Sequence, residues 1–404
     1  MELLRRVGYT APSWASHLRA PEHGRVLLGH LPTPLMPWAC PALRDLDVQW
    51  SLKRDDISGV ELSGNKVRKL EFLMAEALGT GCDCVVTVGG QQSNHCRATA
   101  AAARLVGLEP HLVLVVKTGK EDTDPGMEGN LLAARMLGAR LHICAAADYY
   151  RCGGDLAAMD RLNEAAAEQL RAEGRRPYVV PVGGTAPLAT WGYLSAVDEL
   201  QQQLGSLAGQ RPVDHVVFAA GTGGTAAGLA LGARLAGLGA QMHAVNVQHS
   251  PDDFFPVIDR EAQALGSAPA SEGTARDWLS IHDGSGSGYA VTTPDELGFI
   301  RDVGFESGVV LDHVYTGKAL YHFCRHARDH PERFRGKHIL FWHTGGLPGL
   351  AAKAQELAAV LPPDRTRRLR LPPAEAARPA LKSRAALLRS WRTAPRELPP
   401  ARRE

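Results

Sequence analysis

Short apolar runs alternate with Ala- and Leu-rich segments along most of the chain between residues 31 and 360. Several runs are continuous stretches of Val, Leu and Ile, which is typical of strands buried on both faces. The runs predict strands at residues 48–52, 84–88, 111–116, 140–143, 178–181, 215–219, 243–247 and 339–343. The segments between them, such as 98–106 and 225–235, favour helices. This alternation predicts an α/β fold with one or two mostly parallel sheets and flanking helices.

Composition and charge narrow the class of protein. The 404 residues include 45 Lys and Arg against 43 Asp and Glu, a formal net charge of +2. Nucleic-acid binding, which needs a strongly basic face, is therefore not expected. No apolar run approaches the roughly 20 residues that span a bilayer, so we expect no membrane partner. Seven cysteines are too few for a disulfide framework and favour a reducing compartment, the cytoplasm. Arg5, Arg6 and Arg19 form only a weak organelle import signal.

The last part of the chain has a different composition. Residues 361–404 carry 12 basic and 4 acidic residues and three Pro-Pro pairs, which helix interiors and central strands do not tolerate. We predict a basic, mostly disordered tail with one short helix at residues 381–391. A solvated appendage is the simpler interpretation, and contact with a partner, an anionic surface or nucleic acid is the alternative.

A glycine-rich turn follows one predicted strand. It consists of Gly221, Thr222, Gly223, Gly224 and Thr225, and a helical segment comes next. Free backbone N–H groups and the positive end of the helix dipole suit such a turn to a phosphate. A tight turn without a ligand explains the glycines equally well. The turn is neither a dinucleotide-binding motif nor a Walker loop, because the acidic residue of the first and the lysine of the second are missing.

Two further segments carry candidate chemistry. Ser93 and Asn94 begin a predicted helix after strand 84–88, where they can cap the helix or bind a substrate carboxylate. Lys66 and Lys69 share a face near the start of another predicted helix. Two cations are unfavourable at a helix N-terminus unless an anion binds there. A nearby cation and burial also lower the pKa of an amine, as a nucleophilic lysine requires. Taken singly, exposed surface lysines are the simpler interpretation.

Together these segments resemble a known family. Residues 63–71 (Ser-Gly-Asn-Lys-Val-Arg-Lys-Leu-Glu) and 89–97 (Gly-Gly-Gln-Gln-Ser-Asn-His-Cys-Arg) resemble the pyridoxal-phosphate enzymes of the aminocyclopropane-carboxylate deaminase and D-cysteine desulfhydrase family. The resemblance extends from about residue 13 to residue 353. Further matching stretches are 32–35, 53–56, 181–184, 314–318 and 343–346, and residues 13–17 and 124–126 are similar to plant-type desulfhydrases.

The resemblance implies the tryptophan-synthase β-like fold, known as fold type II, with two domains that each contain a mostly parallel sheet. The large domain, which binds pyridoxal 5'-phosphate, would comprise residues 1–68 and 182–360, and the small domain residues 69–181. Relatives usually dimerise, so a homodimer that acts on a small amino acid is expected.

The resemblance also implies roles for the cofactor-binding residues. Lys66 would bind the cofactor covalently through its amine and serve as the base for the substrate α-proton. Lys69 and the turn from Gly221 to Thr225 would hold the phosphate. Asn94 would bond to the ring hydroxyl of the cofactor.

Residues around the substrate follow in the same way. Ser93, Asn94 and His95 would receive the substrate carboxylate. Tyr289 and Tyr315 would flank the substrate, within reach of its amine and its reacting carbons.

Two threonines bear on which reaction occurs. In the ring-opening deaminases a Glu lies near the pyridine nitrogen and the later motif reads His-Leu-Gly-Gly. Here the matching cofactor-binding positions are Thr316 and Thr344, as in the desulfhydrases. A carboxylate at that nitrogen favours a protonated ring and a strong electron sink, whereas a threonine does not compel protonation. The expected reaction is therefore β-elimination of D-cysteine to pyruvate, ammonia and hydrogen sulfide. The preference for D-cysteine over L-cysteine rests on the resemblance alone. The alternative is ring-opening deamination of 1-aminocyclopropane-1-carboxylate to 2-oxobutanoate and ammonia.

Some features depart from the family or point elsewhere. His313 stands where the family usually has Pro and is expected to alter the loop beside Tyr315, and Gln91 replaces the more usual Ile. A non-catalytic binding protein on the same fold is the alternative from a different class, although a scaffold does not need an unfavourably placed lysine such as Lys66.

No metal site is expected. His322, His326 and His330 recur every four residues, which an exposed helix face explains better than metal binding. Asp55 and Asp56 are expected to form ion pairs or cap a turn rather than act as paired catalytic carboxylates.

Overall fold

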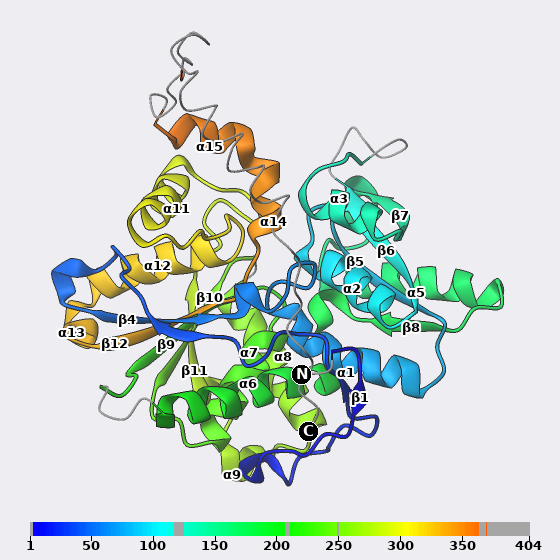
Figure 1. Ribbon diagram of the computed structural model, residues 1–404, viewed down its shortest axis with the longest axis horizontal. Helices are drawn as coiled ribbons and strands as arrows, with labels where there is room; N and C mark the ends of the chain where they lie inside the picture. The colour runs from blue at the N-terminus through cyan, green and yellow to red at the C-terminus, as the bar shows by residue number, and fades with distance from the viewer. Residues whose placement is uncertain (1–2, 117–124, 207–210, 249, 363–368, 370–404) are drawn as a thin grey trace, which may run out of the picture. The chain divides into compact units, whose positions relative to one another are not determined.

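Two mostly parallel sheets dominate the computed structural model of the protein, which describes residues 3–116, 125–206, 211–248, 250–362 and 369 (Figure 1). The larger sheet has the strand order β11 (Leu279–Asp283), β10 (Gln241–Asn246), β9 (His215–Ala220), β12 (His338–His343), β4 (Gln49–Arg54) and β3 (Leu35–Pro37). The smaller sheet has the order β7 (Arg140–Ala145), β6 (Glu109–Val116), β5 (Cys84–Gly90) and β8 (Pro177–Val180). Neighbouring strands are parallel except β3 and β4. A separate antiparallel pair is formed by β1 (Arg6–Val7) and β2 (Arg25–Val26).

Helices connect the strands and cover both sheets. Those in the first half of the chain are α1 (Lys66–Gly79), α2 (Asn94–Leu105), α3 (Gly129–Met136), α4 (Ala146–Arg151), α5 (Leu156–Ala172) and α6 (Pro187–Ser206). Those in the second half are α7 (Gly224–Leu235), α8 (Pro251–Ala264), α9 (Pro269–Glu272), α10 (Ala275–Trp278), α11 (Pro294–Ser307), α12 (Thr316–Asp329), α13 (Pro331–Phe334), α14 (Leu347–Leu350) and α15 (Ala354–Val360). Single 3-10 turns are η1 (Ser13–Ala15), η2 (Arg44–Leu46), η3 (Asp55–Ile57), η4 (Val182–Gly184) and η5 (Ala351–Lys353).

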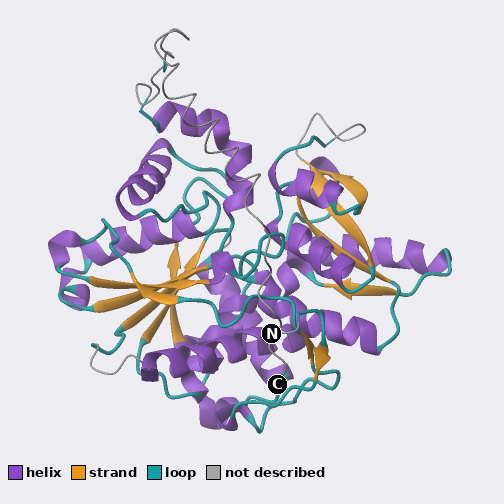
Figure 2. Ribbon diagram, viewed as in Figure 1, coloured by secondary structure: helices purple, strands orange, loops and turns teal. Residues whose placement is uncertain are grey.

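The larger sheet separates two hydrophobic layers. On β9, Val216 and Phe218 pack into the cluster that includes α6, α7 and α8, whereas Val217 and Ala219 pack into the cluster with α11 and α12. Figure 2 shows helices on both faces of this sheet. Burial on both faces explains why these strands read as continuous apolar runs. The smaller sheet is covered in the same way, by α5 on one face and by α2 and α3 on the other.

The predicted fold class is confirmed, and each of the eight predicted strands overlaps an observed one. Sequence analysis missed β1, β2, β3 and β11, which are short or polar. The four-stranded sheet uses strands between residues 84 and 180, and the six-stranded sheet uses strands on either side of that segment. Residues 1–360 form one compact unit, so the domain boundaries 1–68, 69–181 and 182–360 stay a prediction.

The C-terminal segment is a second unit, residues 361–404. Only Leu361, Pro362 and Leu369 are described there, so the predicted disorder and the short helix lie outside the described residues. Within the described part of the chain, no helix is long and apolar enough to cross a membrane.

Candidate active site

A cavity of about 510 Å³ lies where the carboxyl ends of strands from both sheets meet. Its walls come from the end of β5, the start of α2, the end of β9 with its glycine turn, and the loop after β12. Open α/β sheets bind ligands at this kind of edge. The predicted site residues that line it are Lys66, Ser93, Asn94, His95, Gly221, Thr222, Gly223, Thr225, Tyr289, Tyr315 and Thr344. Lys69, Gly224 and Thr316 are not part of the lining.

The glycine turn forms a cradle at the N-terminus of α7. Gly223 has φ +90°, a left-handed conformation that favours glycine. A Cβ atom on Gly224 would lie 2.8 Å from Lys69 Nζ and 2.9 Å from Thr185 Oγ1. Lys69 thus reaches the turn from behind the cavity wall. A lysine ammonium beside a helix N-terminus is suited to a phosphate, so these residues fit the phosphate of pyridoxal phosphate.

Lys66 is the first residue of α1, and its amine faces the cavity. The Nζ atoms of Lys66 and Lys69 each donate to the Gly183 carbonyl oxygen, at 3.2 Å. Burial lowers the pKa of Lys66 to about 8, which raises the share of neutral amine that nucleophilic attack requires. Burial and the neighbouring Lys66 hold the pKa of Lys69 well below its ordinary value.

A buried ionic cluster fixes α1 from its other side. Arg68 Nε and Nη2 donate to the two carboxylate oxygens of Asp55 at 2.9 and 2.8 Å, and Nη1 donates to Glu199 at 3.0 Å. Burial alone would raise the pKa of Asp55, but Arg68 outweighs it and lowers the pKa to about 2. Asp56 pairs with Arg54 instead. The predicted ion-pairing role of the two acids is therefore confirmed.

Three residues at the start of α2 meet the cavity. Ser93 caps the helix, since its Oγ accepts a bond from the Cys96 amide at 3.1 Å. Asn94 Oδ1 accepts from Asn130 Nδ2 at 2.8 Å. His95 is 4% exposed, and its Nε2 bonds with Thr87 Oγ1 at 2.8 Å. Burial and the two lysines of α1 hold the pKa of His95 well below its ordinary value, so the imidazole adds no positive charge for a carboxylate. Its predicted substrate contact stays a prediction.

Two tyrosines form the opposite wall. Tyr289 lies in the loop after β11 and Tyr315 directly before α12, and their hydroxyl oxygens are 2.8 Å apart. The Tyr315 ring packs over the glycine turn, where a Cβ atom on Gly221 would lie 3.0 Å from its Cε1. Burial and the neighbouring Tyr289 raise the pKa of Tyr315 well above its ordinary value, so its hydroxyl keeps its proton.

Asp312 organises the start of α12, a role that sequence analysis missed. Its Oδ2 accepts from the amides of Val314 and Tyr315, each at 2.9 Å. Its Oδ1 accepts from the amide and the hydroxyl of Thr316, each at 2.7 Å. An Asp just before a helix is a known capping signal that could have identified it.

The structure places Thr316 differently from expectation. Its side chain is fully buried, and its hydroxyl both donates to the Asp312 carboxylate and accepts from the Asp312 amide. The predicted contact of Thr316 with the cofactor therefore stays a prediction. Thr344 does line the cavity, and its carbonyl accepts from the Asn65 amide at 3.0 Å, next to Lys66. His313 lies in the same wall and is 4% exposed.

Arg97 is a second residue that sequence analysis left without a role. Its Nε donates to Asn130 Oδ1 at 2.8 Å, and its Nη2 donates to the Ser63 carbonyl at 2.8 Å. A further bond goes to the Glu61 carbonyl. Arg97 therefore ties the start of α2 to the loop that precedes Lys66. Nothing local in the sequence signals such a contact.

The predicted exposed histidine face on α12 is wrong for two of its three members. His322 Nε2 bonds with Glu296 Oε1 at 2.9 Å, and the ring of His326 packs 4.3 Å from that of His282 on β11. Both side chains face neighbouring elements because α12 lies against the sheet. Only His330 is exposed. In the described part of the chain, no group of His, Cys, Asp and Glu is arranged to hold a metal ion.

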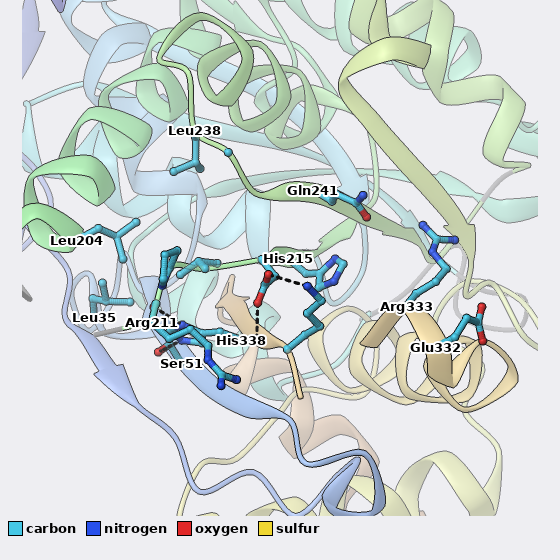
Figure 3. A pocket seen from close by; sticks show the side chains of 15 residues that line it. Leu35, Ser51, Leu204, Arg211, His215, Leu238, Gln241, Glu332, Arg333 and His338 are labelled. Atoms are coloured by element: carbon cyan, nitrogen blue, oxygen red, sulfur yellow. Dashed lines mark hydrogen bonds and ion pairs between the residues drawn. The ribbon is translucent and has the colours of Figure 1, made fainter. Parts of the chain in front are cut away.

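A second cavity, of about 750 Å³, lies at the amino ends of the strands of the larger sheet, where β9, β10 and β12 begin (Figure 3). Leu204 and Leu238 line one side and Glu332 and Arg333 the other. The Asp214 carboxylate accepts bonds there from Lys337 and from the His338 amide. None of the predicted site residues lies in its lining.

Comparisons with known proteins identify the family of the chain. A sequence model of the family described as pyridoxal-phosphate dependent enzyme matches residues 26–345. A bifunctional D-cysteine desulfhydrase/1-aminocyclopropane-1-carboxylate deaminase, mitochondrial, of Arabidopsis thaliana is 43% identical over 360 residues, which cover 89% of this chain and 87% of that protein. A D-cysteine desulfhydrase of Salmonella choleraesuis (strain SC-B67) is 35% identical over 326 residues, 80% of this chain and 93% of that protein.

A solved structure of a relative also matches the fold of this chain. The crystal structure of an ACC deaminase homologue superimposes with a TM-score of 0.68 at 32% identity and covers 81% of this chain and 94% of that chain. The predictions of an enzyme and of its cofactor are confirmed. The chain belongs to the family of pyridoxal-phosphate dependent enzymes, and pyridoxal 5'-phosphate is its cofactor.

Proposed function

We propose that the protein is a carbon–sulfur lyase that converts D-cysteine and water into pyruvate, ammonia and hydrogen sulfide by β-elimination. The observation that carries the proposal is the position of the Lys66 amine. It lies in the same cavity as the cap residue Ser93 and the hydrogen-bonded pair Tyr289 and Tyr315. The names of the Arabidopsis and Salmonella relatives both include D-cysteine desulfhydrase, which supports the choice of substrate.

Each group of residues has one task in this reaction. When bound, the cofactor supplies an electron sink for the electron pair that the Cα–H bond leaves behind when the proton is removed. The Lys66 amine, with its pKa near 8, takes that proton as a general base. Ser93 and Asn94 receive the substrate carboxylate at the N-terminus of α2, where the helix dipole favours an anion. Tyr315, which keeps its proton, can donate to the departing sulfur.

The test compares two neighbouring lysines. Protein incubated with pyridoxal phosphate should absorb in the visible and release hydrogen sulfide and pyruvate in equal amounts from D-cysteine. Lys66→Ala should lose both the absorption band and turnover. Lys69→Ala should keep the band at high cofactor concentration but raise the Kd for the cofactor. A Lys66→Ala protein that keeps band and turnover would refute the assignment.

Ring-opening of 1-aminocyclopropane-1-carboxylate is the second candidate. The name of the Arabidopsis relative includes that deaminase activity as well. Against it, the position that follows Tyr315 is Thr316, whose hydroxyl is already bonded to Asp312. Assays with D-cysteine, L-cysteine and the cyclopropane acid side by side, scored as pyruvate or 2-oxobutanoate, decide between the two.

The proposal includes a reducing compartment, the cytoplasm, and a homodimer. All seven cysteines are free in the structure, which agrees with a reducing environment. Sedimentation of the purified protein measures its oligomeric state, and fluorescent tagging at the C-terminus locates it in the cell.

A further inference from the structure

A buried lysine lies behind the tyrosine wall without touching the cavity. Lys318, in the first turn of α12, has a fully buried side chain. Its Nζ donates to the carbonyl oxygens of Ser285 at 2.6 Å and of Gly288 at 2.9 Å. Glu296 Oε1, on α11, lies 3.9 Å from the same nitrogen. An ammonium enclosed by two carbonyls and a carboxylate keeps its charge compensated despite burial.

The two carbonyls belong to the loop between β11 and α11, which has little regular structure of its own. Gly286, Gly288 and Ala290 all have positive φ, and Ala290, at +58°, is not a glycine. Such a conformation persists only when surrounding contacts enforce it. A Cβ atom on Gly286 would lie 3.1 Å from Glu296 Oε1 and 3.4 Å from Lys318 Nζ. The loop is therefore wrapped closely around the ammonium.

This loop carries Tyr289, the residue after Gly288. Its hydroxyl meets that of Tyr315, which lies three residues before Lys318. The ammonium therefore joins the backbone on the Tyr289 side of the pair to the helix on the Tyr315 side. Tyr289 itself lines the cavity and is 38% exposed, so its position follows that of the loop backbone that carries it.

We propose that Lys318 is a positioning residue, a cation built into the fold that fixes the Tyr289 loop so that Tyr289 stays opposite Tyr315. The consequence for catalysis rests on the function proposed above, but the anchoring of the loop does not. Removing the ammonium leaves the Ser285 and Gly288 carbonyls without their donor and frees the loop to move. A displacement of about 1 Å in a catalytic group can cost about 100-fold in rate.

The test uses Lys318→Ala, with Arg325→Met as a matched control, because Arg325 is an exposed cation on the same helix. Amide hydrogen exchange of peptides covering residues 284–293 is measured without cofactor or substrate. We expect at least about tenfold faster exchange there in Lys318→Ala and no change in Arg325→Met. In the holoenzyme, kcat for D-cysteine should fall about 10- to 100-fold, while the Kd for pyridoxal phosphate stays within twofold.

Chemical rescue separates positioning from general loss of stability. Methylammonium should restore both loop protection and kcat in Lys318→Ala. It should not do so in Lys318→Met, where the side chain fills the space. If Lys318→Ala does not fold by circular dichroism, Lys318→Met, which fills the space but has no N–H donor, is measured for the same faster exchange.

The outcomes are distinguishable. Wild-type exchange rates over residues 284–293 in the folded variant would overturn the proposal, as would equal rescue of the Ala and Met variants. A wild-type holoenzyme that is inert with D-cysteine would refute the proposed function, yet the exchange and rescue experiment on loop protection would still decide the role of Lys318.

Discussion

Four hydrogen bonds converge on the side chain of one residue, Asp312, at the point where Tyr315 enters the active site. Without this carboxylate, three backbone amides and a hydroxyl near α12 lose their acceptor inside the protein. Each buried donor left without a partner costs about 1–3 kcal/mol. The carboxylate therefore links the stability of the helix start to the placement of Tyr315, a residue of the proposed active site.

We expect Asp312→Ala to lower the free energy of unfolding by at least about 3 kcal/mol and to reduce kcat for D-cysteine. Urea denaturation and steady-state kinetics measure the two effects. Asp329→Ala, at an exposed acid of the same helix, is the control and should change the free energy of unfolding by less than about 0.5 kcal/mol. A stability of Asp312→Ala equal to that of the control would contradict the capping role.

The limits of sequence analysis are visible at this scale. Lys66, Ser93 and the glycine turn were candidates because each lies at a strand end or a helix start, and the resemblance to a known family assigned them to one site. Arg97 and Lys318 were not. Arg97 acts on carbonyls 34 and 36 residues away, and Lys318 on carbonyls 30 and 33 residues away. Only the folded chain brings these partners together.

At the scale of elements, the position of α1 depends on the ionic cluster behind it. Arg68 bonds to Asp55 and Glu199, whereas Lys66 lines the cavity and Lys69 reaches the glycine turn. One helix turn thus carries the arginine that anchors the helix and the two lysines of the proposed cofactor site.

Arg68→Met removes one of the two cations that pair with the buried carboxylates of Asp55 and Glu199, and leaves them with Lys53. We expect a loss of about 3–5 kcal/mol in the free energy of unfolding and a higher Kd for pyridoxal phosphate, because α1 can then shift. Equilibrium unfolding in urea and cofactor titration are the measurements. Arg328→Met, an exposed arginine on α12, should behave like the wild type. A cost for Arg68→Met below about 1 kcal/mol would show that the cluster does not anchor the helix.

The strands that were not predicted show how far the sequence pattern alone can identify secondary-structure elements. β11 reads Leu-Ser-Ile-His-Asp, which has two apolar residues in five and therefore does not stand out as a continuous apolar run. It is nevertheless paired with β10 along its length, and the ring of its His282 packs between histidines of β10 and α12. His282 packs there against His243, His326 and Phe323, and only the folded chain brings these rings together.

At the scale of the whole molecule, these histidines form a line through the larger sheet. His215 Nδ1 bonds with His243 Nε2 at 3.0 Å, and His243 Nδ1 with His282 Nε2 at 2.9 Å. His326 on α12 packs against His282. The line thus connects β9, β10, β11 and α12, and the last two elements flank the active-site tyrosines. Burial, with the neighbouring histidines and Arg333, lowers the pKa of His243 to about 2 and that of His282 to about 4.

The line should make the protein sensitive to acid. In the unfolded chain these imidazoles return to a pKa of about 6.5 and bind protons that the folded chain does not accept, so the free energy of unfolding falls as the pH drops from about 6.5 towards 4. Each histidine kept neutral in this way contributes a loss of roughly 1 kcal/mol between pH 7.5 and pH 5.5. Urea denaturation at both pH values, on the wild type, His243→Gln and the exposed control His30→Gln, measures this loss. The difference between the two pH values should shrink by about 1 kcal/mol in His243→Gln alone. An unchanged difference would mean that other groups set the acid sensitivity, whereas the expected shrinkage would show that three strands and a helix are held together by imidazoles that must stay uncharged.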